Sequence, residues 1–91
     1  MTACVVLYHA PECGSCAAVA TMLEELAAAG WLELVSIEIS GDPALEARHR
    51  AELPVVEIDG VVAFTQAVDR RSMLHRLRQA AQTEPPRATR A

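Results

Sequence analysis

Cys13 and Cys16, two cysteines separated by two residues, are the side chains of this sequence best suited to chemistry. They lie where an apolar run ends and an alanine-rich helical pattern begins. Residues three positions apart are neighbours on a helix, and a non-helical conformation at Cys13 could bring the two sulfurs within disulfide reach. The pair can therefore cycle between a dithiol and a disulfide. The same spacing is also found in half of a zinc site, so metal binding stays open at this point.

The flanking segments place the cysteines at the start of a helix. Residues 3–8 are rich in β-branched and apolar side chains and predict a buried strand, which ends at Pro11. Apolar residues then recur at helical spacing as far as Gly30, the expected C-terminal stop. At the first turn, free N–H groups and the positive end of the helix dipole favour a thiolate at Cys13. Cys16 lies one turn further in and should be partly covered by backbone.

The residue before the pair acts against this effect. Glu12 places a carboxylate directly before Cys13, where it opposes a thiolate, and a protonated His9 would counter it. We predict that the pKa of the Cys13 thiol lies below its free value of ~8.5 without being extreme.

The segment after the first helix predicts a second strand and a short helix. Residues 32–39 show a broken apolar alternation that indicates a strand. Strand, helix and strand with a crossover of this length imply a parallel pair with a right-handed connection. Asp42 can then cap a helix whose first position suits Pro43. This helix should run to about Glu52 and end before Pro54.

The remainder predicts a hairpin, a closing helix and a tail. Two β runs, residues 55–58 and 61–64, flank the turn Asp59-Gly60, which is a strong signal for an antiparallel hairpin. Residues 69–81 have an amphipathic helical pattern. Residues 83–91 contain two adjacent prolines and no apolar periodicity, so we expect a folded domain over 1–82 followed by a disordered tail.

Length, charge and cysteine count limit the class of protein. The chain has 91 residues with 52% hydrophobic content, which suits one small domain. Eight basic and twelve acidic residues give a formal charge of −4 without a basic patch, so we expect no nucleic-acid partner. No stretch approaches the ~18 apolar residues of a membrane span, and we expect no membrane association. Three cysteines without a signal peptide favour a cytoplasmic protein, and we expect a monomer.

Taken together, these motifs resemble the thioredoxin superfamily and, at this size, glutaredoxin. The resemblance rests on the Cys-x-x-Cys pair at the first strand-to-helix junction and on Pro54 immediately before the third strand. Asp42-Pro43-Ala44-Leu45, Glu52-Leu53-Pro54-Val55-Val56 and Asp59-Gly60 narrow it to the glutaredoxin-like proteins of bacteria, over residues 3 to about 82. The resemblance implies an α/β, thioredoxin-like fold of glutaredoxin type, in the order βαβ-α-ββα, with a four-stranded mixed sheet flanked by helices.

The resemblance also implies an activity and roles for individual residues. The protein would be a thiol-disulfide oxidoreductase in which Cys13 attacks a substrate disulfide and Cys16 resolves the intermediate. Leu53-Pro54 would be a cis peptide bond, and the backbone of Leu53 would receive an extended substrate. Further substrate contacts would come from three residues around the cysteines: Glu12, Gly14 and Ser15. Substrates would be disulfide-containing proteins or glutathione mixed disulfides, electrons would come from a thiol reductant, and the setting would be cell redox homeostasis and electron transfer.

Three features that hold glutathione in glutaredoxins differ in this sequence. The chain contains no lysine before the cysteine pair, Glu52 stands where a threonine is usual, and no Gly-Gly follows the fourth predicted strand. We therefore predict no resident cofactor. Glutathione stays open as a co-substrate, through Gln66, Asp69 and Arg70.

Zinc binding by the cysteine pair would need further ligands from elsewhere in the chain. Zinc requires about four ligands. The remaining candidates are Cys4, expected to be a buried apolar residue, His9, and two histidines expected to face solvent, His49 and His75. We predict no intramolecular metal site on this shortage. Two alternatives remain: an iron–sulfur cluster carrier that bridges two chains, and a binding module that docks a protein beside Leu53-Pro54 without dithiol turnover.

Overall fold

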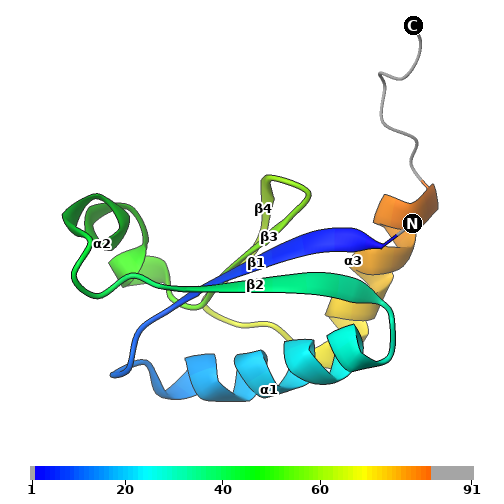
Figure 1. Ribbon diagram of the computed structural model, residues 1–91, viewed down its shortest axis with the longest axis horizontal. Coiled ribbons are helices and arrows are strands. Elements are labelled where there is room, and N and C mark those ends of the chain that lie inside the picture. Colours follow the sequence, from blue (N-terminus) through cyan, green and yellow to red (C-terminus); the bar gives the residue numbers. More distant parts are fainter. Residues whose placement is uncertain (1, 83–91) are drawn as a thin grey trace, which may run out of the picture.

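The computed structural model describes residues 2–82, which form one mixed sheet with helices on both of its faces (Figure 1). The elements follow in the order β1 (Ala3–His9), α1 (Gly14–Ala28), β2 (Leu32–Glu38), α2 (Pro43–His49), the 3-10 helix η1 (Arg50–Glu52), β3 (Val55–Ile58), β4 (Val61–Thr65) and α3 (Arg70–Gln82). The predicted order is confirmed. The expected second helix is divided into α2 and the single 3-10 turn of η1. The tail predicted for residues 83–91 lies outside the described residues.

The sheet has four strands in the order β2-β1-β3-β4. β1 pairs in parallel with β2, so the first half of the chain is the expected βαβ unit. β1 and β3 are antiparallel, as are β3 and β4. The mixed four-stranded sheet implied by the resemblance is therefore present. β1 lies between β2 and β3, so the carboxyl end of β1, from which the loop with the cysteine pair starts, is flanked by strands on both sides.

The hairpin between β3 and β4 follows from its turn residues. Asp59 and Gly60 both have positive φ, +52° and +87°, as a two-residue type I′ turn requires. The Asp59 side chain accepts a hydrogen bond from the backbone N–H of Cys4 at 3.0 Å, and the Asp59 N–H donates to the Cys4 carbonyl at 2.8 Å. These two bonds fasten the turn to the start of β1.

The main core lies between one face of the sheet and helices α1 and α3. Val5 and Leu7 alternate along β1 and point to this face, where they meet side chains of both helices. The buried members of the core are Val5, Leu7, Val19, Leu23, Leu26, Leu32, Val56, Ile58, Met73 and Leu77. The alanines of α1 favour a helix but offer little side chain to bury. Its few larger apolar residues, which lie in this core, hold the helix against the sheet.

The opposite face of the sheet is covered by α2 at one end only (Figure 1). Tyr8 points to this face, and its ring stacks on the imidazole of His49 with centroids 4.1 Å apart. The expectation that His49 faces solvent is wrong, because this stacking leaves the residue only 4% exposed. His75 on α3 is exposed, as predicted.

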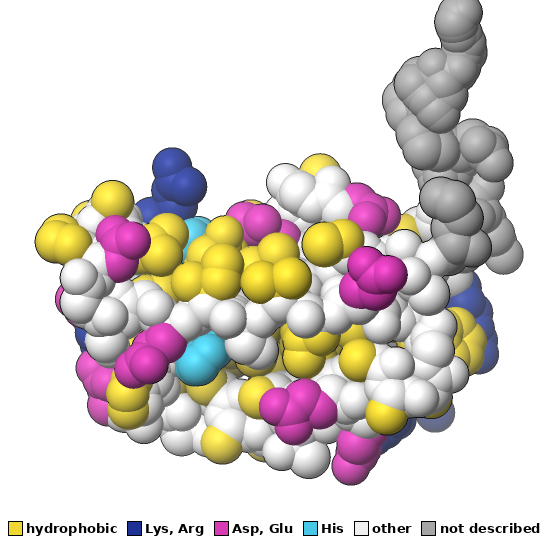
Figure 2. All heavy atoms as spheres, in the orientation of Figure 1, with side chains coloured by type: hydrophobic (Ala, Val, Ile, Leu, Met, Phe, Trp, Pro, Cys, Tyr) yellow, Lys and Arg dark blue, Asp and Glu magenta, His cyan; other side chains and the backbone are white. Residues whose placement is uncertain are grey.

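The expectation that Cys4 is buried is also wrong. Cys4 is a free, exposed cysteine. It alternates with the buried Val5 and therefore points to the face that α2 covers only near Tyr8, at the other end of β1. Figure 2 shows hydrophobic side chains left at the surface over β1 and β2 beside α2, and Val35 of β2 is 47% exposed.

No helix within residues 2–82 combines the length and the apolar character that crossing a bilayer requires.

Candidate active site

The cysteine pair lies at the N-terminus of α1 and is joined as a disulfide. Cys13 is the N-cap residue, with extended backbone angles φ −88° and ψ 104°, and Cys16 lies in the first turn. The two Cα atoms are 5.4 Å apart. Cys13 thus has the non-helical conformation that was expected to bring the two sulfurs within disulfide reach.

The two sulfur-bearing residues differ in exposure. Cys13 is partly exposed, whereas Cys16 is 3% exposed and belongs to the buried side of α1. The Cys13 N–H donates to the Ala10 carbonyl at 3.1 Å, which closes the turn that leads into the helix. A reagent or substrate from solvent therefore reaches Cys13 first.

The helix end leaves its positive charge available to Cys13. No acidic residue lies in the first turn of α1, and the Cys13 side chain makes no capping hydrogen bond. The Ser15 hydroxyl lies 3.7 Å from the Cys13 sulfur. Backbone N–H groups and a hydroxyl next to this sulfur favour its anionic form.

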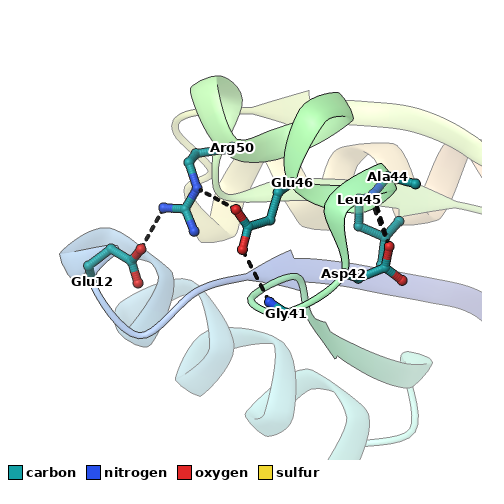
Figure 3. A network of polar contacts seen from close by, with 7 residues as sticks. All are labelled: Glu12, Gly41, Asp42, Ala44, Leu45, Glu46 and Arg50. Carbon is teal, nitrogen blue, oxygen red and sulfur yellow. Dashed lines mark hydrogen bonds and ion pairs between the residues drawn. The ribbon is translucent and has the colours of Figure 1, made fainter.

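A chain of polar contacts joins the loop before Cys13 to the second helix (Figure 3). The Arg50 guanidinium contacts the Glu12 carboxylate at 2.5 Å and the Glu46 carboxylate, one helical turn earlier, at 3.5 Å. Glu46 in turn accepts a hydrogen bond from the Gly41 N–H at 3.1 Å. Asp42 caps α2 as predicted, with its side chain accepting from the N–H groups of Ala44 and Leu45 at 3.1 and 3.2 Å.

These contacts affect the ionisation of Glu12 and Arg50. A hydrogen bond from its own backbone N–H lowers the pKa of Glu12, and the Arg50 guanidinium lowers it further. The hydrogen bond to Glu12, followed by the one to Glu46, raises the pKa of Arg50. Both groups are therefore charged at neutral pH, and the carboxylate next to Cys13 has a fixed cation against it.

The Leu53-Pro54 peptide bond is cis, as the resemblance implied. Pro54 is buried, and Leu53 is partly exposed. The Gln66 N–H lies between the carbonyls of Pro54 and Glu52, at 2.9 and 3.0 Å, and so ties the end of β4 to this loop. The Arg50–Glu12 contact holds the segment leading into this loop against the loop before Cys13.

The residues considered for glutathione binding make hydrogen bonds or ion pairs with other residues of the chain. Asp69 accepts hydrogen bonds from the N–H and hydroxyl of Ser72 at the start of α3, and these bonds lower the pKa of Asp69. Arg70 is paired with Glu25 of α1. Gln66 contributes its backbone, in a left-handed conformation with φ +72°. Asp69 and Arg70 thus make contacts within the protein, with Ser72 and Glu25.

Two features of this region were not predicted from the sequence. The Glu12–Arg50 pair joins residues 38 positions apart, and the only sequence signal was the i,i+4 spacing of Glu46 and Arg50. The His49 stack on Tyr8 had no signal at all. Burial raises the pKa of Tyr8, and nearby Glu57 raises it further. Within residues 2–82, no group of three or more side chains suitable for holding a metal ion is present.

Residues 4–81 match the family model described as "Glutaredoxin-like domain (DUF836)". The chain belongs to this family. No curated protein matches it. Among solved structures it is similar to chloroplastic thioredoxin z, at 22% identity and a TM-score of 0.74, over 90% of this chain and 80% of that one. It is also similar to a malarial protein, at 14% identity and a TM-score of 0.65, over 91% of this chain and all of that one. These likenesses show a thioredoxin-like fold.

Proposed function

We propose that this glutaredoxin-like protein is a thiol-disulfide oxidoreductase with Cys13 as nucleophile and Cys16 as resolving thiol. The observation that carries the proposal is the asymmetric pair itself: a partly exposed Cys13 at the N-terminus of α1, bonded to a Cys16 that is 3% exposed. An accessible sulfur can meet a substrate, and a covered neighbour can displace it.

The reaction starts from the reduced pair. The Cys13 thiolate attacks one sulfur of a substrate disulfide, the substrate S–S bond breaks, and the first substrate thiolate leaves and takes up a proton. Cys16 then loses its proton and attacks the Cys13 sulfur, which releases the second substrate thiol and forms the Cys13–Cys16 disulfide. Two electrons and two protons pass from the protein to the substrate. A thiol reductant returns them in the reverse sense.

The substrate would lie along the cis-proline loop. The backbone of Leu53, next to the cis bond, would receive an extended peptide, and Glu12, Gly14 and Ser15 would make further contacts beside the Cys13 sulfur. We propose a protein disulfide or a glutathione mixed disulfide as substrate, glutathione as a co-substrate at most, no resident cofactor, and a monomer working in the cytoplasm.

Cysteine variants test these roles. Cys4 is exposed and would react independently, so each variant is made together with Cys4→Ser. The Cys16→Ser protein should accumulate a mixed disulfide on Cys13 when mixed with a model peptide disulfide, read by mass spectrometry. The Cys13→Ser protein should form no adduct and should not reduce the peptide. Full dithiol turnover by Cys13→Ser would contradict the assignment.

A further inference from the structure

The loop before the cysteine pair carries a charge that works against the proposed chemistry. Glu12 is directly next to Cys13, is 59% exposed, and is ionised at neutral pH. A carboxylate beside a sulfur that must become a thiolate raises the free energy of that thiolate. The first turn of α1 has no acidic residue, so Glu12 stands apart from an otherwise favourable helix end.

Arg50 meets this carboxylate from a different part of the chain. It follows α2 directly and contacts Glu12 at 2.5 Å (Figure 3). Its guanidinium also contacts Glu46, which accepts a bond from the Gly41 N–H, and α2 itself is capped by Asp42. The cation is therefore held by α2 and does not depend on Glu12 alone for its position.

We propose that Arg50 is a positioning residue that neutralises Glu12 and thereby preserves the reactivity of the Cys13 thiolate. The inference rests on the proposed function, in which this thiolate is the attacking group. Arg50, the first residue of η1, supplies a positive charge that the sequence around the cysteines lacks. The charged groups joined by contacts to this loop are Glu12, Arg50 and Glu46, and His9 ends the strand that leads into it.

The size of the effect follows from exposure. The Arg50 and Glu12 side chains are 41% and 59% exposed, so water and salt screen their charges. A single screened charge near a thiol changes its thiolate population by a small factor, and the nucleophilicity of the sulfur changes partly in the opposite sense. We expect two- to threefold changes in the rate of Cys13 alkylation, on the order of what such screened charges produce.

The test measures alkylation of the reduced protein, with Cys4→Ser in every variant, at about pH 6 and low salt, where the thiolate fraction limits the rate. Arg50→Gln should slow Cys13 alkylation about two- to threefold, and Glu12→Gln should accelerate it by a similar factor. The double variant should return close to the starting rate. About 1 M salt should reduce all these differences, because it shortens the screening length to ~3 Å.

Arg78→Gln is the matched control. It removes the same charge, but Arg78 lies over Trp31 beyond the far end of α1, and the 15 residues of that helix span about 22 Å. Its alkylation rate should be unchanged.

The signs of the changes decide the outcome. If Arg50 merely held the loop in place, Arg50→Gln and Glu12→Gln would break the same contact and move the rate in the same direction. Changes of equal sign, or no change in either variant, would overturn the proposal. The rate reports the free thiol only, so a failure of Cys13 to form mixed disulfides would count against the oxidoreductase function without altering this result.

Discussion

Reduction of the Cys13–Cys16 disulfide should lower the stability of the fold by an amount that the loop length fixes. The two cysteines are three positions apart, so the bond closes a very short loop. The chain-entropy relation gives about 2 kcal/mol at 25 °C for a loop of this size, because the bond restricts the unfolded chain. In a domain of this length, 1 kcal/mol corresponds to roughly 4–8 °C, so the midpoint of thermal unfolding should fall by roughly 8–16 °C on reduction.

Thermal unfolding followed by circular dichroism, with and without a dithiol reductant, measures this difference. A Cys13→Ala/Cys16→Ala variant is the control and should not respond to the reductant. By a thermodynamic cycle, the same ~2 kcal/mol is the amount by which folding favours the disulfide over the two thiols. The reduction potential of the pair should therefore be about 40 mV lower in the folded chain than in the unfolded chain.

Equal midpoints for the oxidised and reduced proteins would refute the loop-closure reasoning. A more stable reduced form would refute it too, and would mean that the start of α1 gains more from free thiols than the bond supplies.

Three further predictions concern the elements that hold the site. Asp42→Ala should cost about 1 kcal/mol because α2 loses the acceptor for two N–H groups, whereas Asp42→Asn should cost less; denaturant unfolding measures both. Leu23→Ala should cost about 2–5 kcal/mol in the same assay, since Leu23 is fully buried between α1 and the sheet. The lowered pKa of Asp69 contributes stability above its usual pKa that is lost as the pH falls through the folded value, so Asp69→Asn should flatten the decline in stability below about pH 4. An unchanged acid profile in this variant would contradict the role given to Ser72.

Local signals predicted most of the elements, because each depends on only a few residues. Asp59-Gly60 specifies a turn with two positive φ angles, and Asp42-Pro43 supplies a cap followed by the best first helical residue. The start of α1 was likewise predicted from a few neighbouring residues, at the change from an apolar run to the cysteine pair and an alanine-rich helical pattern. The cis bond at Pro54 came from the family resemblance, since a proline alone does not determine it.

The errors arose where burial depends on distant elements. Strand alternation shows that Cys4 and Val5 point to opposite faces, but it does not show which face a helix covers. α2 has only seven residues, so its own pattern could not reveal that His49 would meet Tyr8. The contact of Glu12 with Arg50 likewise depends on where α2 lies on the sheet, and a single ion pair at the surface leaves no periodic signal.

The most direct test of the central claim is the redox equilibrium of the cysteine pair. The protein is equilibrated across a series of glutathione redox buffers, its free thiols are trapped by alkylation, and the states of Cys13 and Cys16 are read by mass spectrometry. The oxidoreductase account predicts an internal disulfide whose midpoint lies in the range of about −270 to −120 mV known for such pairs. Both thiols remaining free across the whole series would contradict it.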